Sequence, residues 1–138
     1  MKFWLIKSEP ETYSIDALKK DGKTSWDGVR NYQARNFMRD GMKKGDQVLF
    51  YHSNAEPPGV AGVCCVVKEG YPDDTADGAA WVMVDVEFVK KFKRFVALDE
   101  LKDDKKLQGM LVVKKGMRLS VQPVNKAHFD EVCRLGSQ

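Results

Sequence analysis

Short apolar runs alternate with polar, helix-like stretches along this chain, and the pattern predicts a protein that mixes strands with helices. Val60–Glu69 is almost continuously apolar, which is typical of a strand buried on both faces. Trp81–Val89 alternates instead, with Val84 and Val86 on one face and Asp85 and Glu87 on the other, as in a half-buried antiparallel strand. We expect strands at Phe3–Lys7, Gln47–Ser53, Val60–Glu69, Trp81–Val89 and Met117–Val124.

Capping and turn residues between these strands predict the helices. Ser14 and Asn125 are favourable N-cap residues, and Asp21-Gly22 is typical of a helix end. We expect helical segments at Ile15–Lys20, Asn31–Arg39, Leu98–Asp104, Leu107–Met110 and Lys126–Leu135, and a loop over Gly70–Ala80. The sequence has no internal repeat or long linker, so it predicts one α+β domain over residues 1–138. A sheet of five or six strands tends to curl toward a barrel.

Composition narrows the classes of partner. The chain has 138 residues, of which 43% are hydrophobic, and 23 Lys and Arg against 20 Asp and Glu give a net charge of +3. This balance excludes a polybasic protein that binds nucleic acid by charge alone. Any nucleic-acid binding must therefore come from a local site.

Other classes of protein are not expected either. The longest apolar run is too short for a membrane span, and the apolar stretch at the start of the sequence is too short for a signal peptide. Three cysteines, two of them adjacent, favour a reducing compartment over a disulfide framework. Two histidines do not provide a multi-His metal site. We expect a cytoplasmic protein, nuclear if the source is a eukaryote, without a metal or cofactor.

The stretch from Trp26 to Asn36 is rich in aromatic, amide and guanidinium groups and poor in aliphatic ones. A planar aromatic beside amides suits a planar, hydrogen-bonding ligand such as a nucleobase, and Arg binds phosphate. The alternative is that Trp26 is a core residue and the arginines are solvated. The candidate residues of this stretch are Trp26, Arg30, Asn31, Tyr32, Arg35 and Asn36.

Three other segments carry candidate chemistry. His52 is followed by Ser53 and Asn54 at a predicted strand end, where it is either a general base or a hydrogen-bond partner within the strand. Ser8-Glu9-Pro10 is either a simple turn or a segment whose carboxylate accepts from a base amino group. Alternation places Arg118, Ser120 and Gln122 on one strand face, which lines a groove or faces solvent at a sheet edge.

Taken together, these segments resemble the EVE domain family, in the family's order and over essentially the whole chain. The matching motifs are Lys2–Pro10, Trp26–Asn36, Tyr51–Asn54, Gly59–Gly62, Tyr71–Asp73 and Arg118–Pro123. The resemblance implies a PUA-like fold, a small and strongly curved β-barrel decorated with helices. It also implies kinship with YTH domains, which hold a methylated adenine of RNA in an aromatic cage, and binding of modified bases, including cytosine derivatives in DNA.

The resemblance implies a non-catalytic reader that stacks an extruded base on Trp26, with Tyr71 or Tyr51 opposite. The second Trp of the YTH cage is absent, since Tyr71-Pro72-Asp73 stands in its place. The expected base pocket comprises Trp26, Asn31, Tyr32, Asn36, Tyr51, His52, Ser53, Asn54, Tyr71, Ser8 and Glu9. Phosphates are expected at Arg30, Arg35 and Arg118. The expected partner is nucleic acid carrying a modified base, bound by a monomer away from membranes.

Two other hypotheses belong to different classes. The first is a PUA-type RNA-binding adaptor that has no preference for modification. The second is an enzyme acting on modified nucleic acid, with His52 and Glu9 as an acid–base pair.

Overall fold

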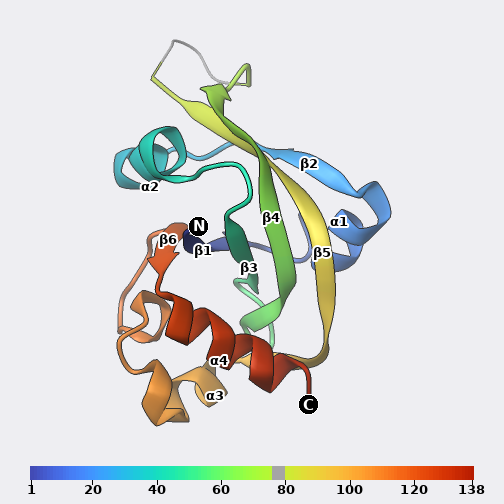
Figure 1. Cartoon of the computed structure of the whole chain (residues 1–138), viewed down its shortest axis with the longest axis vertical. Helices are drawn as coiled ribbons and strands as arrows, with labels where there is room; N and C mark the ends of the chain where they lie inside the picture. Colours follow the sequence, from blue (N-terminus) through green and yellow to red (C-terminus); the bar gives the residue numbers. More distant parts are fainter. Residues whose placement is uncertain (76–79) are drawn as a thin grey trace.

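The computed structural model describes residues 1–75 and 80–138, and it contains one six-stranded sheet in the order β2-β5-β4-β3-β1-β6. The strands are β1 (Phe3–Ser8), β2 (Lys23–Trp26), β3 (Gln47–His52), β4 (Gly59–Pro72), β5 (Val82–Ala97) and β6 (Val121–Val124). β1 pairs with β3 in parallel, and the other neighbouring pairs are antiparallel. Figure 1 shows β4 and β5 running along most of the molecule, with α2 near one end and α3 and α4 near the other.

The helices begin where side chains cap them. Ser14 accepts a hydrogen bond from the N–H of Ala17 at the start of α1, and Asn125 accepts one from His128 at the start of α4, as their N-cap positions predict. The α-helices are α1 (Ile15–Asp21), α2 (Tyr32–Asn36), α3 (Leu98–Asp103) and α4 (Lys126–Gly136). Shorter turns are the π-helix η1 (Phe37–Gly41) and the 3₁₀ helices η2 (Lys105–Leu107) and η3 (Leu111–Val113).

Both faces of the sheet are buried. Trp4 and Phe50 belong to a first core cluster, whereas Leu5 and Leu49 belong to a second, because successive side chains of a strand point to opposite faces. The first cluster also holds Ile15 and Leu18 of α1, Ala34 of α2 and Met38 of η1, and the second holds Leu101 of α3 and Val132 of α4. The two clusters explain why β4 is almost continuously apolar.

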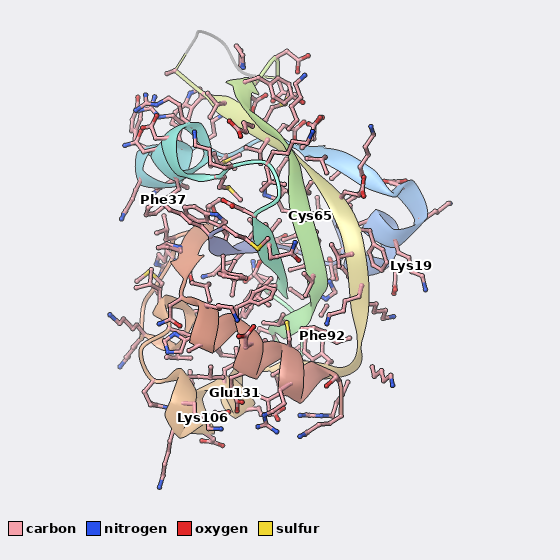
Figure 2. The ribbon with its side chains drawn as sticks, in the orientation of Figure 1. Lys19, Phe37, Cys65, Phe92, Lys106 and Glu131 are labelled. Atoms are coloured by element: carbon pink, nitrogen blue, oxygen red, sulfur yellow. The ribbon has the colours of Figure 1, made fainter. Side chains whose placement is uncertain are left out.

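Helix α4 covers the second cluster at close range. Phe92 of β5 lies beneath it (Figure 2), and a Cβ at position 136 would overlap the Phe92 ring. Gly136 therefore lets the end of the helix approach the strand.

The α+β class is confirmed, and the sheet is curled rather than closed into a barrel. β2 and β6 are its two edges, and within the described residues no strand pairing joins them. The strand order nevertheless leaves three strands between β2 and β1, so groups from these two strands meet only because the sheet curls.

Several element boundaries differ from the sequence prediction. β2 was not expected, because its polar residues are too few to show a pattern, but it pairs with β5 from Lys23 to Trp26. The expected loop at 70–80 begins later, since Tyr71 and Pro72 still pair with β5, and positions 76–79 lie outside the described residues. The predicted strand Met117–Val124 is formed only from Val121, and the helix expected at Asn31–Arg39 changes to a π-helix at Phe37.

Candidate functional site

A pocket of about 610 Å³ lies at the seam between the two edges of the curled sheet. One wall comes from β2 and the loop that follows it, and the other from the end of β1 and the segment before β6. It is lined by Lys7, Ser8, Thr12, Tyr13, Thr24, Ser25, Trp26, Asp27, Gly28, Val29, Arg30, Asn31 and Ser120. Of the predicted site residues, the structure brings Ser8, Trp26, Arg30 and Asn31 together here.

Trp26 is both a core-packing residue and a pocket wall. Its ring is half-buried and meets Phe50 of the first cluster edge to face, at 5.6 Å between centroids and an interplanar angle of 81°. Tyr13 meets it at 6.2 Å and 71°. These contacts fix the orientation of the indole while another part of it remains on the pocket. The two interpretations of Trp26 are therefore compatible.

The rest of the lining is mainly polar. Ser8 donates to the carbonyl of Tyr13 at 2.6 Å, and the Asn31 side-chain oxygen accepts from the N–H of Ala34 at 3.0 Å as the N-cap of α2. Among residues 1–75 and 80–138, the Asn31 amide NH₂ donates no hydrogen bond. Lys7 donates to the carbonyl of Met117, and burial lowers its pKa. Amide, hydroxyl and ammonium groups around one indole form a site for a flat ligand with hydrogen-bonding edges.

A buried carboxylate holds the loop on the β2 side of the pocket. Asp73 accepts from the N–H of Gly28 at 2.9 Å and from Nη1 of Arg30 at 3.0 Å. The N–H and hydroxyl of Thr75 also donate to it. Burial alone would raise the pKa of Asp73, but these hydrogen bonds outweigh burial and hold the pKa well below its usual range. Arg30, which we expected to bind a phosphate, forms an ion pair with Asp73 in the structure, and this ion pair positions the pocket wall.

Two aromatic side chains lie beside the pocket rather than in its lining. Tyr32 and Trp81 are stacked, with centroids 4.8 Å apart and rings inclined by 26°. Arg30 lies over the Trp81 ring and Arg35 over the Tyr32 ring. Arg35 also donates to Asn36 and to the carbonyl of Ala80. Tyr32, Arg35 and Asn36 thus form a surface group next to the pocket.

The predicted residues of β3 fall elsewhere. Tyr51 is buried in the second core cluster, whereas its neighbour Phe50 belongs to the first, on which Trp26 packs. The two clusters differ because adjacent residues of a strand face opposite sides of the sheet. Nε2 of His52 accepts a hydrogen bond from the N–H of Ile15 at 3.1 Å. Burial lowers the pKa of His52, so the imidazole is a neutral acceptor at the start of α1.

The strand-end polar residues form a rim next to Ser8. Asn54 donates to the Glu9 carboxylate at 2.6 Å, and the N–H of Ser53 donates to the carbonyl of Ser8 at 2.9 Å. None of Glu9, Ser53 or Asn54 lines the pocket. Their expected contacts with a base edge stay a prediction.

Tyr71 and Arg118 also lie outside the lining. The Tyr71 hydroxyl donates to Asp85 and lies 3.0 Å from Ser25 Oγ, and Lys68 lies over its ring. Arg118 is exposed, two residues before the pocket residue Ser120. Gln122, expected on the same polar face, is instead buried and donates to the carbonyl of Leu119.

Part of the opposite wall, Lys7, Thr12 and Tyr13, was missed by sequence reasoning, whereas Ser8 and the groove-lining face of Ser120 had been proposed. Lys7, Thr12 and Tyr13 come from one segment of the chain, and the distant Ser120 reaches them through the pairing of β1 with β6. No local motif marks Thr12 or Tyr13. Asp73 had a signal, since a carboxylate follows the matched Tyr71-Pro72 pair, but its buried partners are set by the tertiary structure.

Two further findings concern metals and membranes. The parts of the chain that the structure describes contain no group of three or more His, Cys, Asp or Glu side chains suited to a metal ion. Within the same residues, every helix falls short of the length and apolar character that a membrane crossing requires.

Comparison with known proteins gives consistent matches over the whole chain. The EVE domain model matches residues 2–135. Thymocyte nuclear protein 1 from Homo sapiens is 43% identical over 165 aligned residues, which cover 96% of this chain and 72% of that protein. A crystal structure of human THYN1 in complex with DNA containing 5-methylcytosine has a TM-score of 0.91 and 41% identity, over 100% of this chain and 99% of that one. The Mmi1 YTH domain, solved with RNA, shares the fold at a TM-score of 0.61 and 13% identity, over 97% and 76% of the two chains.

Proposed function

Because the chain belongs to the EVE domain family, we propose that it is a non-catalytic reader of a modified base, most directly 5-methylcytosine in DNA. The target base enters the seam pocket and stacks on Trp26. Entry requires extrusion of the base from the duplex, because a stacked base exposes no face to the indole.

One observation carries this proposal: the Trp26 ring is anchored by Phe50 and Tyr13 but still lines a polar pocket. An indole fixed in advance stacks a base without an ordering cost, and base–aromatic stacking contributes about 1–3 kcal/mol. A buried methyl group adds about 0.8 kcal/mol, which corresponds to roughly fourfold discrimination. The NH₂ of Asn31, which lines the pocket, supplies a hydrogen bond to a base edge.

The enzyme hypothesis receives less support from the same geometry. Nε2 of His52 already accepts the Ile15 N–H, and Glu9 accepts from Asn54. These two groups therefore serve separate structural contacts instead of forming an acid–base pair. A reducing compartment, the cytoplasm or the nucleus of a eukaryote, suits the free thiols of Cys64, Cys65 and Cys133.

The test compares matched duplexes that differ by a single 5-methylcytosine. Fluorescence anisotropy of the labelled duplex gives the affinity of the wild type, Trp26→Ala, Trp26→Phe and a remote exposed control, Val89→Ala. We expect the wild type to favour the methylated duplex about fourfold. Trp26→Ala should lose about tenfold or more in affinity, Trp26→Phe should lose less, and Val89→Ala should behave as the wild type.

The outcomes separate the hypotheses. Equal affinity of the wild type for methylated and unmethylated duplexes would overturn the reader, and equally tight binding of unmodified RNA would favour the adaptor. Unchanged binding by a correctly folded Trp26→Ala would overturn the pocket assignment. Thermal unfolding of each variant verifies that it is folded.

A further inference from the structure

An aromatic pair beside the pocket has one ring, that of Tyr32, that is more exposed than packing alone would leave it. Tyr32 is 62% exposed, one of three large apolar side chains that stand out in this way within the described residues. Its ring nevertheless has a fixed position, because it stacks on Trp81 at 4.8 Å. A large aromatic ring held in place at the surface is typical of a contact site.

Two guanidinium groups accompany this pair. Arg30 Cζ lies 5.6 Å from the centre of Trp81, and Arg35 Cζ lies 5.1 Å from the centre of Tyr32. Asp73 holds Arg30, while Asn36 and the Ala80 carbonyl hold Arg35. Nη2 of Arg35 has no hydrogen-bond partner among the described residues. The pair and its two arginines therefore present positive charge and apolar surface in one preorganised group.

The position of this group relative to the pocket indicates its occupant. Arg30 and Asn31 line the pocket, and Tyr32 is the next residue of the chain. A strand that places one base in the pocket has its next nucleotide one phosphodiester away. The groups at the pocket margin are the ones that this nucleotide meets.

We propose that Tyr32, Trp81, Arg30 and Arg35 form a flanking platform that holds the nucleotide next to the base in the pocket. Tyr32 contacts the neighbouring base or sugar, and Arg35 contacts its phosphate through its guanidinium group. The inference rests on the proposed function of the pocket but assigns a separate role. The platform provides affinity for the strand, whereas the pocket provides discrimination between bases.

The experiment measures affinity, discrimination and salt dependence separately. Tyr32→Ala and Arg35→Gln are compared with Arg134→Gln, which removes the same charge on the distant helix α4. For the duplex, we expect Tyr32→Ala to lose about tenfold in affinity. The ratio of its affinities for methylated and unmethylated duplex should equal that of the wild type. The free nucleoside 5-methyldeoxycytidine should bind with the same affinity to Tyr32→Ala and to the wild type. Arg35→Gln should reduce the slope of log K against log salt by about 0.9, and Arg134→Gln should leave it unchanged.

Each result decides a distinct point. Wild-type duplex affinity in both Tyr32→Ala and Arg35→Gln would overturn the platform. A lowered methylation ratio in either variant would also overturn it, because those residues would then belong to base recognition. If the wild type binds duplex without discrimination but Arg35→Gln still lowers the salt slope, the platform stands and the reader function fails.

Discussion

The guanidinium of Arg30 and the carboxylate of Asp73 join the loop after β2 to the turn after β4, with 3.0 Å between Nη1 and Oδ2. The Asp73 side chain is fully buried, whereas that of Arg30 is 39% exposed. The carboxylate therefore faces inward to its donors, and the arginine extends from it to both the pocket and the flanking platform. One ion pair fixes the relative positions of the two surfaces.

Replacing Asp73 by Asn should lower the free energy of unfolding by about 1–3 kcal/mol. The carboxylate accepts hydrogen bonds through both oxygens, whereas the amide has one oxygen and places its NH₂ against a donor that then lacks an acceptor. The same variant should weaken duplex binding, since Gly28 and Arg30 lose their anchor. Urea denaturation measures the first effect and anisotropy the second. Asp74→Asn, which changes the adjacent exposed carboxylate, should stay within about 0.5 kcal/mol of the wild type.

The Asp73 effect should depend on pH. Hydrogen bonds hold the folded pKa of Asp73 below the unfolded value of about 3.9, so the stabilisation is complete above about pH 5 and is lost as pH falls through the folded pKa. The difference in unfolding free energy between wild type and Asp73→Asn should narrow below about pH 4. A difference that stays constant down to the acid transition would contradict this account.

Replacing Asn31 separates its two roles. Asn31→Ser keeps an N-cap acceptor for the Ala34 N–H, so the free energy of unfolding should change by less than about 0.5 kcal/mol. The same change removes the NH₂ group from the pocket, and affinity for the methylated duplex should fall about tenfold, the value of one hydrogen bond to a ligand. Asn31→Ala should lose both properties. Unchanged affinity in Asn31→Ser would place the base away from this side chain.

Replacing His52 tests a structural role against a binding role. Burial lowers the pKa of His52, so its folded pKa lies below the unfolded value near 6.5. The unfolded state then binds more protons, and stability should fall as pH decreases from about 7 through the folded pKa. His52→Ala should cost about 1 kcal/mol at neutral pH and remove this part of the pH dependence, because the Ile15 N–H loses its acceptor. Duplex affinity should be unchanged, and a large loss would move His52 into the recognition site.

The Cys64 thiol should be unreactive toward alkylating reagents in the native protein. Its side chain is fully buried, and burial raises the pKa of the thiol well above its usual range. Alkylation followed by mass spectrometry should modify Cys64 at least about 10³-fold more slowly in buffer than in urea, because access requires unfolding. Cys65 and Cys133, which are half-buried, should react first. Rapid native modification of Cys64 would indicate local opening of β4.

The sequence predicted the elements with local signals. Ser14 and Asn125 marked the starts of α1 and α4, and the apolar run of β4 indicated burial on two faces. The four residues of β2, three of them polar, gave no such signal, since the strand exists through its pairing with β5. Local chemistry identifies caps and periodicity, but edge pairing is a tertiary property.

One wall of the pocket could be predicted from the sequence and much of the other could not, again because the second depends on strand pairing. The stretch beginning at Trp26 forms one wall in sequence order, so its unusual composition was visible. The facing wall depends on Lys7 and Ser120, which meet through pairing of β1 with β6. Tyr51 shows the limit of motif reasoning, because it lies one residue after Phe50 and this single step turns it to the other face.

The open seam also affects how this protein resists unwanted association. An unclosed sheet leaves backbone donors and acceptors on which a foreign strand can assemble. Here both edges are only four residues long, β6 contains Pro123, which has no N–H to donate, and β2 begins with the charged Lys23. The opening between the edges admits a single flat ligand. The edges themselves present too few backbone hydrogen-bonding groups for a foreign strand to pair with, so the same short edges give access to the pocket and limit aggregation.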